Sequence, residues 1–303
     1  MSKGLHRYAV FVASATFFLI IAGANVTSHD AGLATSDWPK SNGQWFPQMV
    51  GNLFWEHGHR MVATAVGMLT IGLAIYAQVS ERRTWVKLLA WGALAAVIAQ
   101  GLLGGLTVKL NLPLIVSAAH ATLAQLFFLI TVSLAVFTSR RWVDAAPVQP
   151  VPEGPRLRSM CVLALIVILT QLVLGATLRH SATWDRDLPT PLLVAHICGA
   201  VVVTLVLSTT IGFVLLRYRE EAYLSRPAVI AAVLLLVQLG LGLAAYLTRL
   251  RSPFDPQPLN PMISVTVAHV ACGALVFAAT IVLTLRLFRT VPANRSEYRL
   301  APA

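Results

Sequence analysis

The sequence predicts an all-α, polytopic membrane protein with eight transmembrane helices. Hydrophobic residues make up 57% of the 303 residues, charged residues make up 12%, and the mean hydropathy is +0.72. Because soluble domains carry about 25% charged residues, this chain has too little polar surface for a soluble fold. Apolar runs near the roughly 20 residues that span a bilayer recur along the chain. They lack the alternation of polar and apolar residues that marks barrel strands.

Eight apolar runs make up most of the chain. The predicted spans are 8–28, 55–79, 85–108, 114–138, 158–179, 190–216, 227–248 and 261–286. The first run also has features of a signal peptide, since Lys3 and Arg7 precede it and Ala22-Gly23-Ala24 resembles a cleavage site. The internal repeat described below favours a retained helix, because cleavage would leave one half of the chain a helix short.

The basic residues predict the orientation in the membrane. The formal charge is +11, and most of the 23 Lys and Arg residues lie in gaps on the side that holds both termini. By the positive-inside rule, both termini of this cell (inner) membrane protein are expected in the cytoplasm. Loops 29–54, 109–113, 180–189 and 249–260 then face outward. The clustering in short gaps indicates contact with the lipid bilayer and argues against a nucleic-acid partner.

A proline-rich segment divides the chain. Residues 139–157 read SRRWVDAAPVQPVPEGPRL, and their four prolines favour an extended linker. We therefore expect an N-terminal four-helix half over 1–145, a cytoplasmic linker over 146–157 and a C-terminal four-helix half over 158–303.

The two halves share sequence patterns. A Q-x-x-L-G pattern begins at Gln100, Gln171 and Gln238, near the outer ends of the third, fifth and seventh spans. The segments AAHATLAQ, VAHICGAV and VAHVACGA each place a histidine after a small residue, in the fourth, sixth and eighth spans. A parallel repeat of one four-helix unit, giving two pseudo-repeated bundles, explains both patterns.

One histidine lies early in each even-numbered span, on the outer side and about 5–12 Å deep at 1.5 Å per residue. These residues are His59, His120, His196 and His269. A single buried histidine is often only a hydrogen-bonding contact between helices, but four at one depth indicate metal ligands. Facing helices of one unit can bind haem iron from both faces, which pairs His59 with His120 and His196 with His269. Zinc requires further ligands, and the sequence around His196 and His269 offers none, so haem is favoured.

Small residues flank these histidines. They either let a flat ring approach the helix or serve as ordinary helix-packing contacts. These residues are Ala119, Ala195, Ala268, Gly199 and Gly273.

The other reactive side chains have simpler interpretations. All three cysteines lie within apolar runs, so neither a structural disulfide nor a thiol metal cluster is expected. These are Cys161, Cys198 and Cys272. The remaining histidines are expected to be solvated, judged from their placement. These are His6, His29, His57 and His180.

Glu56 distinguishes the N-terminal pair from the other. It lies three residues before His59, on the same helix face, and no acid precedes the other three histidines at that spacing. It also lies four residues before Arg60, so a simple salt bridge is the alternative interpretation. A carboxylate beside an iron site can accept a proton or position an oxygen nucleophile. A pure electron-transfer protein has no clear need for one.

These residues resemble those of a known family, the haem A synthases of bacteria and mitochondria. The resemblance covers nearly the whole chain and includes the two four-helix halves, the histidines of the even spans and the acid-x-x-His-Arg element at 56–60. The first outer loop, VTSHDAGLATSDWPKSNG over 26–43, adds a Gly-Leu pair and then Asp-Trp-Pro ahead of a glycine. These residues are Gly32, Leu33, Asp37, Trp38, Pro39 and Gly43.

The resemblance implies an activity and its cofactors. Such enzymes are membrane oxidoreductases that oxidise the C8 methyl group of haem O to a formyl group by successive hydroxylations, giving haem A for terminal oxidases. It implies that His196 and His269 bind a resident haem b, that His59 and His120 face the substrate haem, and that Glu56 is the catalytic acid. The implied partners are haem O synthase, oxidase assembly factors and an electron donor or acceptor.

The sequence departs from the family in its cysteines. Some members carry one cysteine pair in the first outer loop and a second pair in the outer loop between spans five and six. Here Thr35 and Ser41 stand at the first two positions, and 180–189 contains no cysteine. A loop disulfide and a catalytic thiol are therefore excluded.

Outward-facing cations are candidates to bind the haem propionates, with loop solvation or snorkelling as the alternative. We expect Arg60 first and Arg249 second in this role. The other candidates are Lys109, Arg179 and Arg251.

Two other functions fit part of the sequence. The main alternative is a bis-histidine di-haem electron-transfer cytochrome without a haem substrate, and the other is a transporter with histidine proton relays. Glu56 and the Asp-Trp-Pro loop favour the synthase over the cytochrome. The lack of charge at span centres argues against a transporter.

Overall fold

The computed structural model describes residues 3–148, 154–181, 189–250 and 259–292. Over these ranges the chain forms nine helices and no strands beyond an isolated bridge between Ser41 and Gln44. The helices are α1 (Lys3–Ser28), α2 (Asn52–Ser80), α3 (Thr84–Lys109), α4 (Leu114–Phe137), α5 (Arg140–Val143), α6 (Gly154–Ser181), α7 (Thr190–Arg217), α8 (Ala222–Leu250) and α9 (Asn260–Thr290). All except α5 contain a segment long and apolar enough to cross a membrane. The predicted all-α fold with eight membrane spans is confirmed.

The segment between the halves contains more helix than the prolines indicate. Helix α5 occupies four residues of the predicted extended stretch, and the Ser139 side chain accepts a hydrogen bond from the Trp142 backbone N–H at its start. Helix α6 begins at Gly154, four residues before the predicted span. Pro155 falls in its first turn, where a missing backbone N–H costs no hydrogen bond. Residues 149–153 of the linker lie outside the described ranges.

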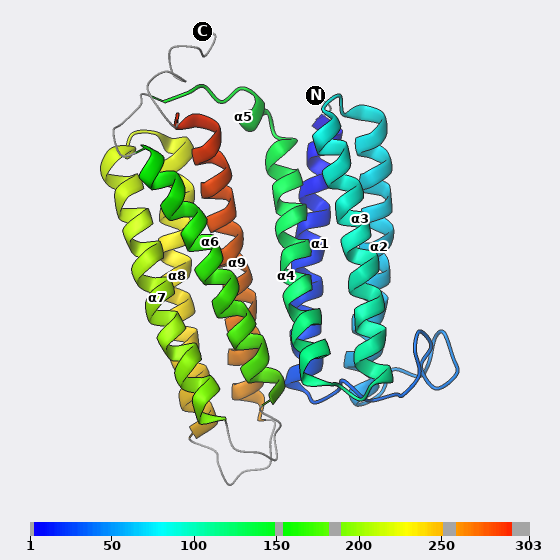
Figure 1. The fold of residues 1–303 in the computed structure, drawn as a ribbon. Coiled ribbons are helices and arrows are strands. Elements are labelled where there is room, and N and C mark those ends of the chain that lie inside the picture. The colour runs from blue at the N-terminus through cyan, green and yellow to red at the C-terminus, as the bar shows by residue number, and fades with distance from the viewer. Residues whose placement is uncertain (1–2, 149–153, 182–188, 251–258, 293–303) are drawn as a thin grey trace.

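The long helices form two rings of four (Figure 1). In the first ring α1, α2, α3 and α4 each pack against the next, and α1 also packs against α4; helices α6 to α9 repeat this arrangement. Fully buried alanines lie within both rings. They include Ala9, Ala74, Ala90 and Ala93 in the first and Ala164, Ala228 and Ala231 in the second. Small side chains let membrane helices approach closely, while large apolar side chains such as Phe18 and Ile115 are exposed, as expected of lipid-facing positions.

The two rings lie side by side. Helices α1 and α4 of the first ring pack against α9 of the second, and α4 also packs against α6. Ile20, Phe128, Ala274 and Ala278, from α1, α4 and α9, form an apolar cluster at this junction. We call the loop end the end at which α1, α3, α6 and α8 finish and α2, α4, α7 and α9 begin. Figure 1 shows that α1 begins and α9 ends at the opposite end.

Arg179 joins the two rings at the loop end. It lies in the last turn of α6, and its Nη2 donates hydrogen bonds to the Ser28 side-chain oxygen at 2.6 Å and to the Ala24 carbonyl at 3.1 Å, both on α1. Hydrogen bonds from a charged donor are stronger than neutral ones. Arg179 therefore holds the second ring against the part of α1 that supports the site described next.

We predict that Arg179→Leu weakens the packing of the two rings. Its loss removes two hydrogen bonds from a charged group, each contributing about 1.5–3 kcal/mol, so the thermal unfolding midpoint of the detergent-solubilised protein should fall. Arg82→Leu, at an exposed position at the opposite end, is the control and should leave the midpoint unchanged. Equal midpoints for the two variants would show that Arg179 does not join the rings.

Candidate functional site

The four histidines lie at one level near the loop end. His59, His120, His196 and His269 fall six to nine residues into α2, α4, α7 and α9, which is about 9–14 Å along a helix at 1.5 Å per residue. All four are half-buried. One histidine therefore comes from every second helix of each ring.

Each histidine ring lies against a glycine of the preceding long helix. A Cβ atom on Gly23, Gly104, Gly175 or Gly242 would lie 2.9–3.1 Å from Cε1 of His59, His120, His196 or His269, respectively. Real Cβ atoms rarely approach another atom so closely. Because these glycines of α1, α3, α6 and α8 have no side chain, each imidazole ring can pack directly against the helix at that position.

Three of these glycines end the Q-x-x-L-G pattern, and the glutamine of each pattern contacts the same histidine. Gln100 and Gln171 donate from Nε2 to the backbone carbonyls of His120 and His196, at 3.0 and 2.8 Å. Gln238 Nε2 lies 3.3 Å from Nε2 of His269. Residues four apart share a helix face. The glutamine and the glycine of each Q-x-x-L-G pattern therefore lie on the same face of α3, α6 or α8, and both contact the histidine ring.

The glycines after His196 and His269 have a specific neighbour. A Cβ atom on Gly273 would lie 3.2 Å from Nε2 of Gln238, and one on Gly199 would lie 2.1 Å from Oε1 of Gln171. The sequence left open whether these glycines admit a flat ring or pack against a helix. In the structure they accommodate the glutamine side chains.

The imidazole rings of the two histidines of the C-terminal half lie close together. The ring centroids of His196 and His269 are 6.4 Å apart, with an interplanar angle of 75°. Two imidazoles bound to opposite sides of one metal ion, with metal–nitrogen distances of about 2.0 Å, place their centroids about 6.3 Å apart. His59 and His120 are close enough to interact electrostatically.

These residues fit a haem group. Nδ1 of His59, His120 and His269 is buried without a hydrogen-bond partner among the described residues, as expected for imidazoles with an unused coordination or donor role. Within the described ranges, no three His, Cys, Asp or Glu side chains gather around a point that could hold a metal ion. Histidines on facing helices could hold a haem iron from its two sides.

Glu56 is buried beneath the first loop, residues 29–51. One of its oxygens accepts a hydrogen bond from the Thr35 backbone N–H at 3.0 Å, and the other accepts from Nη2 of Arg60. The salt bridge that the sequence offered as the simpler interpretation is therefore present. The carboxylate also anchors the loop at Thr35. Any chemical role of Glu56 must therefore be compatible with its hydrogen bonds to Thr35 and Arg60.

Arg60 is bound to the same loop. Its Nη1 donates to the carbonyls of Asp37 and Lys40, both at 2.8 Å, and to the Ser41 side-chain oxygen at 3.2 Å. To bind a haem propionate, Arg60 would have to do so while keeping these hydrogen bonds, or replace some of them with bonds to the propionate. Arg249, the second candidate, lies in the last turn of α8, and residues 251–258 lie outside the described ranges.

His57 is buried, and the prediction that it is solvated was wrong. One ring nitrogen, Nδ1, lies 2.9 Å from the Ser41 side-chain oxygen, and the other, Nε2, lies 3.1 Å from the Trp45 carbonyl. The periodicity correctly placed His57 away from the His59 face. The first loop folds over that opposite face, which helix periodicity alone does not indicate. His29 also has an ordered neighbour, because its ring stacks on Trp55 with centroids 3.9 Å apart.

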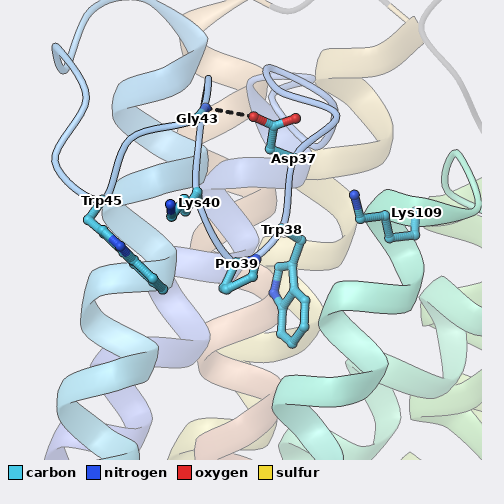
Figure 2. A pocket seen from close by; sticks show the side chains of 7 residues that line it. All are labelled: Asp37, Trp38, Pro39, Lys40, Gly43, Trp45 and Lys109. Atoms are coloured by element: carbon cyan, nitrogen blue, oxygen red, sulfur yellow. Dashed lines mark hydrogen bonds between the residues drawn. The ribbon is translucent and has the colours of Figure 1, made fainter.

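The Asp-Trp-Pro element seats the loop on the first ring (Figure 2). A Cβ atom on Gly105 of α3 would lie 2.7 Å from the Trp38 ring, so this glycine admits the indole. Asp37 accepts a hydrogen bond from the Gly43 backbone N–H at 2.7 Å, which closes the turn. Beside Trp38 lies a pocket of about 260 Å³. It is lined by Asp37, Trp38, Pro39, Lys40, Gly43, Trp45 and Lys109.

The cysteines stay away from this loop. All three are free thiols, and Cys272 donates a hydrogen bond from Sγ to the Leu234 carbonyl at 3.4 Å. Thr35 and Ser41, at the positions where some family members carry cysteines, are both buried; the Thr35 hydroxyl oxygen accepts a hydrogen bond from the Asp37 backbone N–H within the loop, and the Ser41 hydroxyl bonds to His57 of α2. Hydrogen bonds to hydroxyl groups thus hold the loop at these two positions.

We predict that Gly175→Ala displaces the His196 ring and lowers the haem content of the purified protein. The added methyl group would lie 2.9 Å from Cε1 of His196, which is too close without movement. Gly240→Ala, on α8 with no atom within 4 Å of the added methyl group, is the matched control. Haem content that is equal in the two variants would mean that the glycine contact does not set the ring position.

Comparisons with known proteins agree with this arrangement. Residues 48–184 match the COX15-CtaA family, described as cytochrome oxidase assembly protein. A haem A synthase of Geobacillus kaustophilus is 24% identical over the whole chain and 99% of its own length. One of Symbiobacterium thermophilum is 29% identical over 59% of this chain and 60% of its own length, and one of Bacillus pumilus is 24% identical over 78% and 84%. The chain is therefore a multi-pass membrane protein that is similar to haem A synthases along its whole length.

Proposed function

We propose that this protein is a haem A synthase, which oxidises the C8 methyl group of haem O to a formyl group. The observation that carries the proposal is the unequal chemistry of two similar histidine pairs. His59 and His120 have a buried carboxylate, Glu56, on the helix of one ligand. His196 and His269 have no acid at the equivalent positions. Two pairs that only transferred electrons would not require this difference.

We assign the resident haem b to the C-terminal pair. The 6.4 Å separation of the His196 and His269 rings suits axial ligation, and both rings have a glutamine beside them. When bound there, the haem supplies one-electron transfer. His196 of α7 and His269 of α9 would hold this group.

The substrate haem O is assigned to the N-terminal pair. Two successive hydroxylations convert the methyl group to a geminal diol, and loss of water gives the aldehyde. Each hydroxylation removes two electrons from the carbon, so an electron donor or acceptor outside the described fold takes part. Glu56 is placed to accept a proton or orient an oxygen nucleophile next to the His59 ligand. The first loop is anchored on Glu56, Arg60 and His57, close in sequence to the His59 ligand.

We also propose that the loop end faces outward and that both termini are cytoplasmic. Basic residues concentrate on the side that holds the ends of α1 and α9, as the positive-inside rule requires. Haem O would then enter from the bilayer between helices, because the histidines lie within the membrane spans.

The direct test is conversion of substrate. Cells that make haem O but lack a haem A synthase should accumulate haem A when this protein is expressed, measured by extracting and separating the pigments. Haem b alone in the purified protein, with no haem A in the cells, would favour the di-haem electron-transfer alternative.

Glu56→Gln separates chemistry from loop anchoring. The amide keeps an oxygen to accept from Thr35 but loses basicity, so we expect haem A formation to fall by about 10²–10⁴-fold, the usual contribution of general acid–base catalysis, while haem b content is retained. Glu81→Gln is the matched control, because Glu81 also forms a salt bridge, with Arg83, beyond the other end of α2. Normal haem A formation by Glu56→Gln would make Glu56 only a structural residue.

A further inference from the structure

Ser117 of α4 carries a buried hydroxyl group that has no hydrogen-bond partner in the part of the chain that the structure describes. The residue is only 2% exposed. Serine and threonine hydroxyls inside helices usually donate to a carbonyl one turn earlier. Thr122 of the same helix donates to the Ala118 carbonyl at 2.8 Å, and Ser133 donates to the Leu129 carbonyl at 2.7 Å. A buried hydroxyl without a partner costs free energy, which indicates a partner that is not part of the chain.

Ser117 holds the same position relative to its histidine as Glu56. It lies three residues before His120, as Glu56 lies three residues before His59, and residues three apart are neighbours on a helix surface. Each side chain therefore starts about 4.5 Å nearer the loop end than its histidine, at 1.5 Å per residue. Both side chains are buried. The N-terminal pair thus has a polar group beside each of its two histidines.

The positions of α2 and α4 decide where these two groups lie relative to a haem. The two helices occupy opposite corners of the first ring, because each packs against both α1 and α3. The line from His59 to His120 therefore crosses the ring, roughly perpendicular to the helix axes. Since a haem plane is perpendicular to the line that joins its axial ligands, a haem held by this pair has one edge toward the loop end. Glu56 and Ser117 then flank that edge, one on each face of the haem.

The C-terminal pair differs at the equivalent positions. Leu193 lies three residues before His196, and Thr266 lies three residues before His269. The Thr266 hydroxyl donates to the Met262 carbonyl of its own helix at 2.7 Å. Within the described ranges, an unpaired buried serine or threonine hydroxyl therefore occurs only beside the pair assigned to the substrate.

We propose that Ser117 is a positioning residue that donates a hydrogen bond to the oxygen which the reaction places on the C8 carbon of the haem substrate. This inference rests on the proposed function. The methyl group of haem O offers no acceptor, so the hydrogen bond forms only after the first hydroxylation. It then holds the hydroxymethyl group beside Glu56 for the second hydroxylation, and it also binds the formyl group of the product.

Resonance Raman spectroscopy of added haem A tests this contact without turnover, because a hydrogen bond to the formyl oxygen lowers the frequency of the C=O stretching band. Haem A bound to the wild-type protein, with the resident haem b in place, should show a lowered band. Ser117→Ala should return the band to the frequency of haem A in detergent alone. Ser133→Ala is the matched control in the same helix, since that hydroxyl is already bonded to Leu129, and it should keep the lowered band.

Binding affinities and stability give a second measurement. Ser117→Ala should weaken the binding of haem A by about 2–12-fold, as expected from the loss of one neutral hydrogen bond, and should leave the affinity for haem O unchanged. Because the hydroxyl lacks a partner in the described chain, its removal should not lower the thermal unfolding midpoint of the protein without added haem A. A lower midpoint with equal losses of haem A and haem O binding would make Ser117 a packing residue and overturn the proposal.

An unshifted formyl band in the wild-type protein, or the same lowered band in Ser117→Ala, would also overturn the proposal. Either result together with normal haem A formation in cells would leave the proposed function standing. A wild-type protein that binds added haem A with a lowered band, yet forms no haem A in cells, would contradict the proposed function and support the Ser117 contact.

Discussion

The contact of each imidazole with a helix glycine determines most of the site. Gly23, Gly104, Gly175 and Gly242 each leave a space that one histidine ring fills, and this holds the four rings at one level. The same contacts bring helices together, because each helix that carries one of the four histidines packs closely against the long helix before it. Without a hydrophobic driving force between helices in lipid, such close approaches between small residues are a main source of packing energy.

The proposed function depends on how the N-terminal half differs from the C-terminal half. Glu56 adds a buried carboxylate beside one ligand. The outer loop adds a second difference, because Arg60, His57 and Trp38 fasten it over the same ring of helices. A buried carboxylate and an ordered loop are thus both attached to the helix that carries His59, while the C-terminal half has no acid at the equivalent positions.

Much of the fold could be predicted from the sequence, because the length of the apolar runs determines the membrane spans. The candidate site could be predicted because histidines and an acid are unusual within such runs. The eight spans were predicted within a few residues, and the resemblance to haem A synthases was found from Glu56, the four histidines and the Asp-Trp-Pro loop. The glycine beneath each ring was missed, although the repeated Q-x-x-L-G pattern was its signal. Which residue a histidine touches depends on the rotation of two helices about their axes. The burial of His57 depends on a loop whose path no periodicity encodes.

The central claim is that the four histidines form two separate haem sites, with the resident haem on His196 and His269. Electron paramagnetic resonance of the oxidised, haem-loaded protein tests this most directly, because bis-imidazole haem gives a low-spin signal. His269→Ala should remove the low-spin signal of the resident haem, and His59→Ala should leave it unchanged. Loss of that signal in His59→Ala, or its persistence in His269→Ala, would contradict the account.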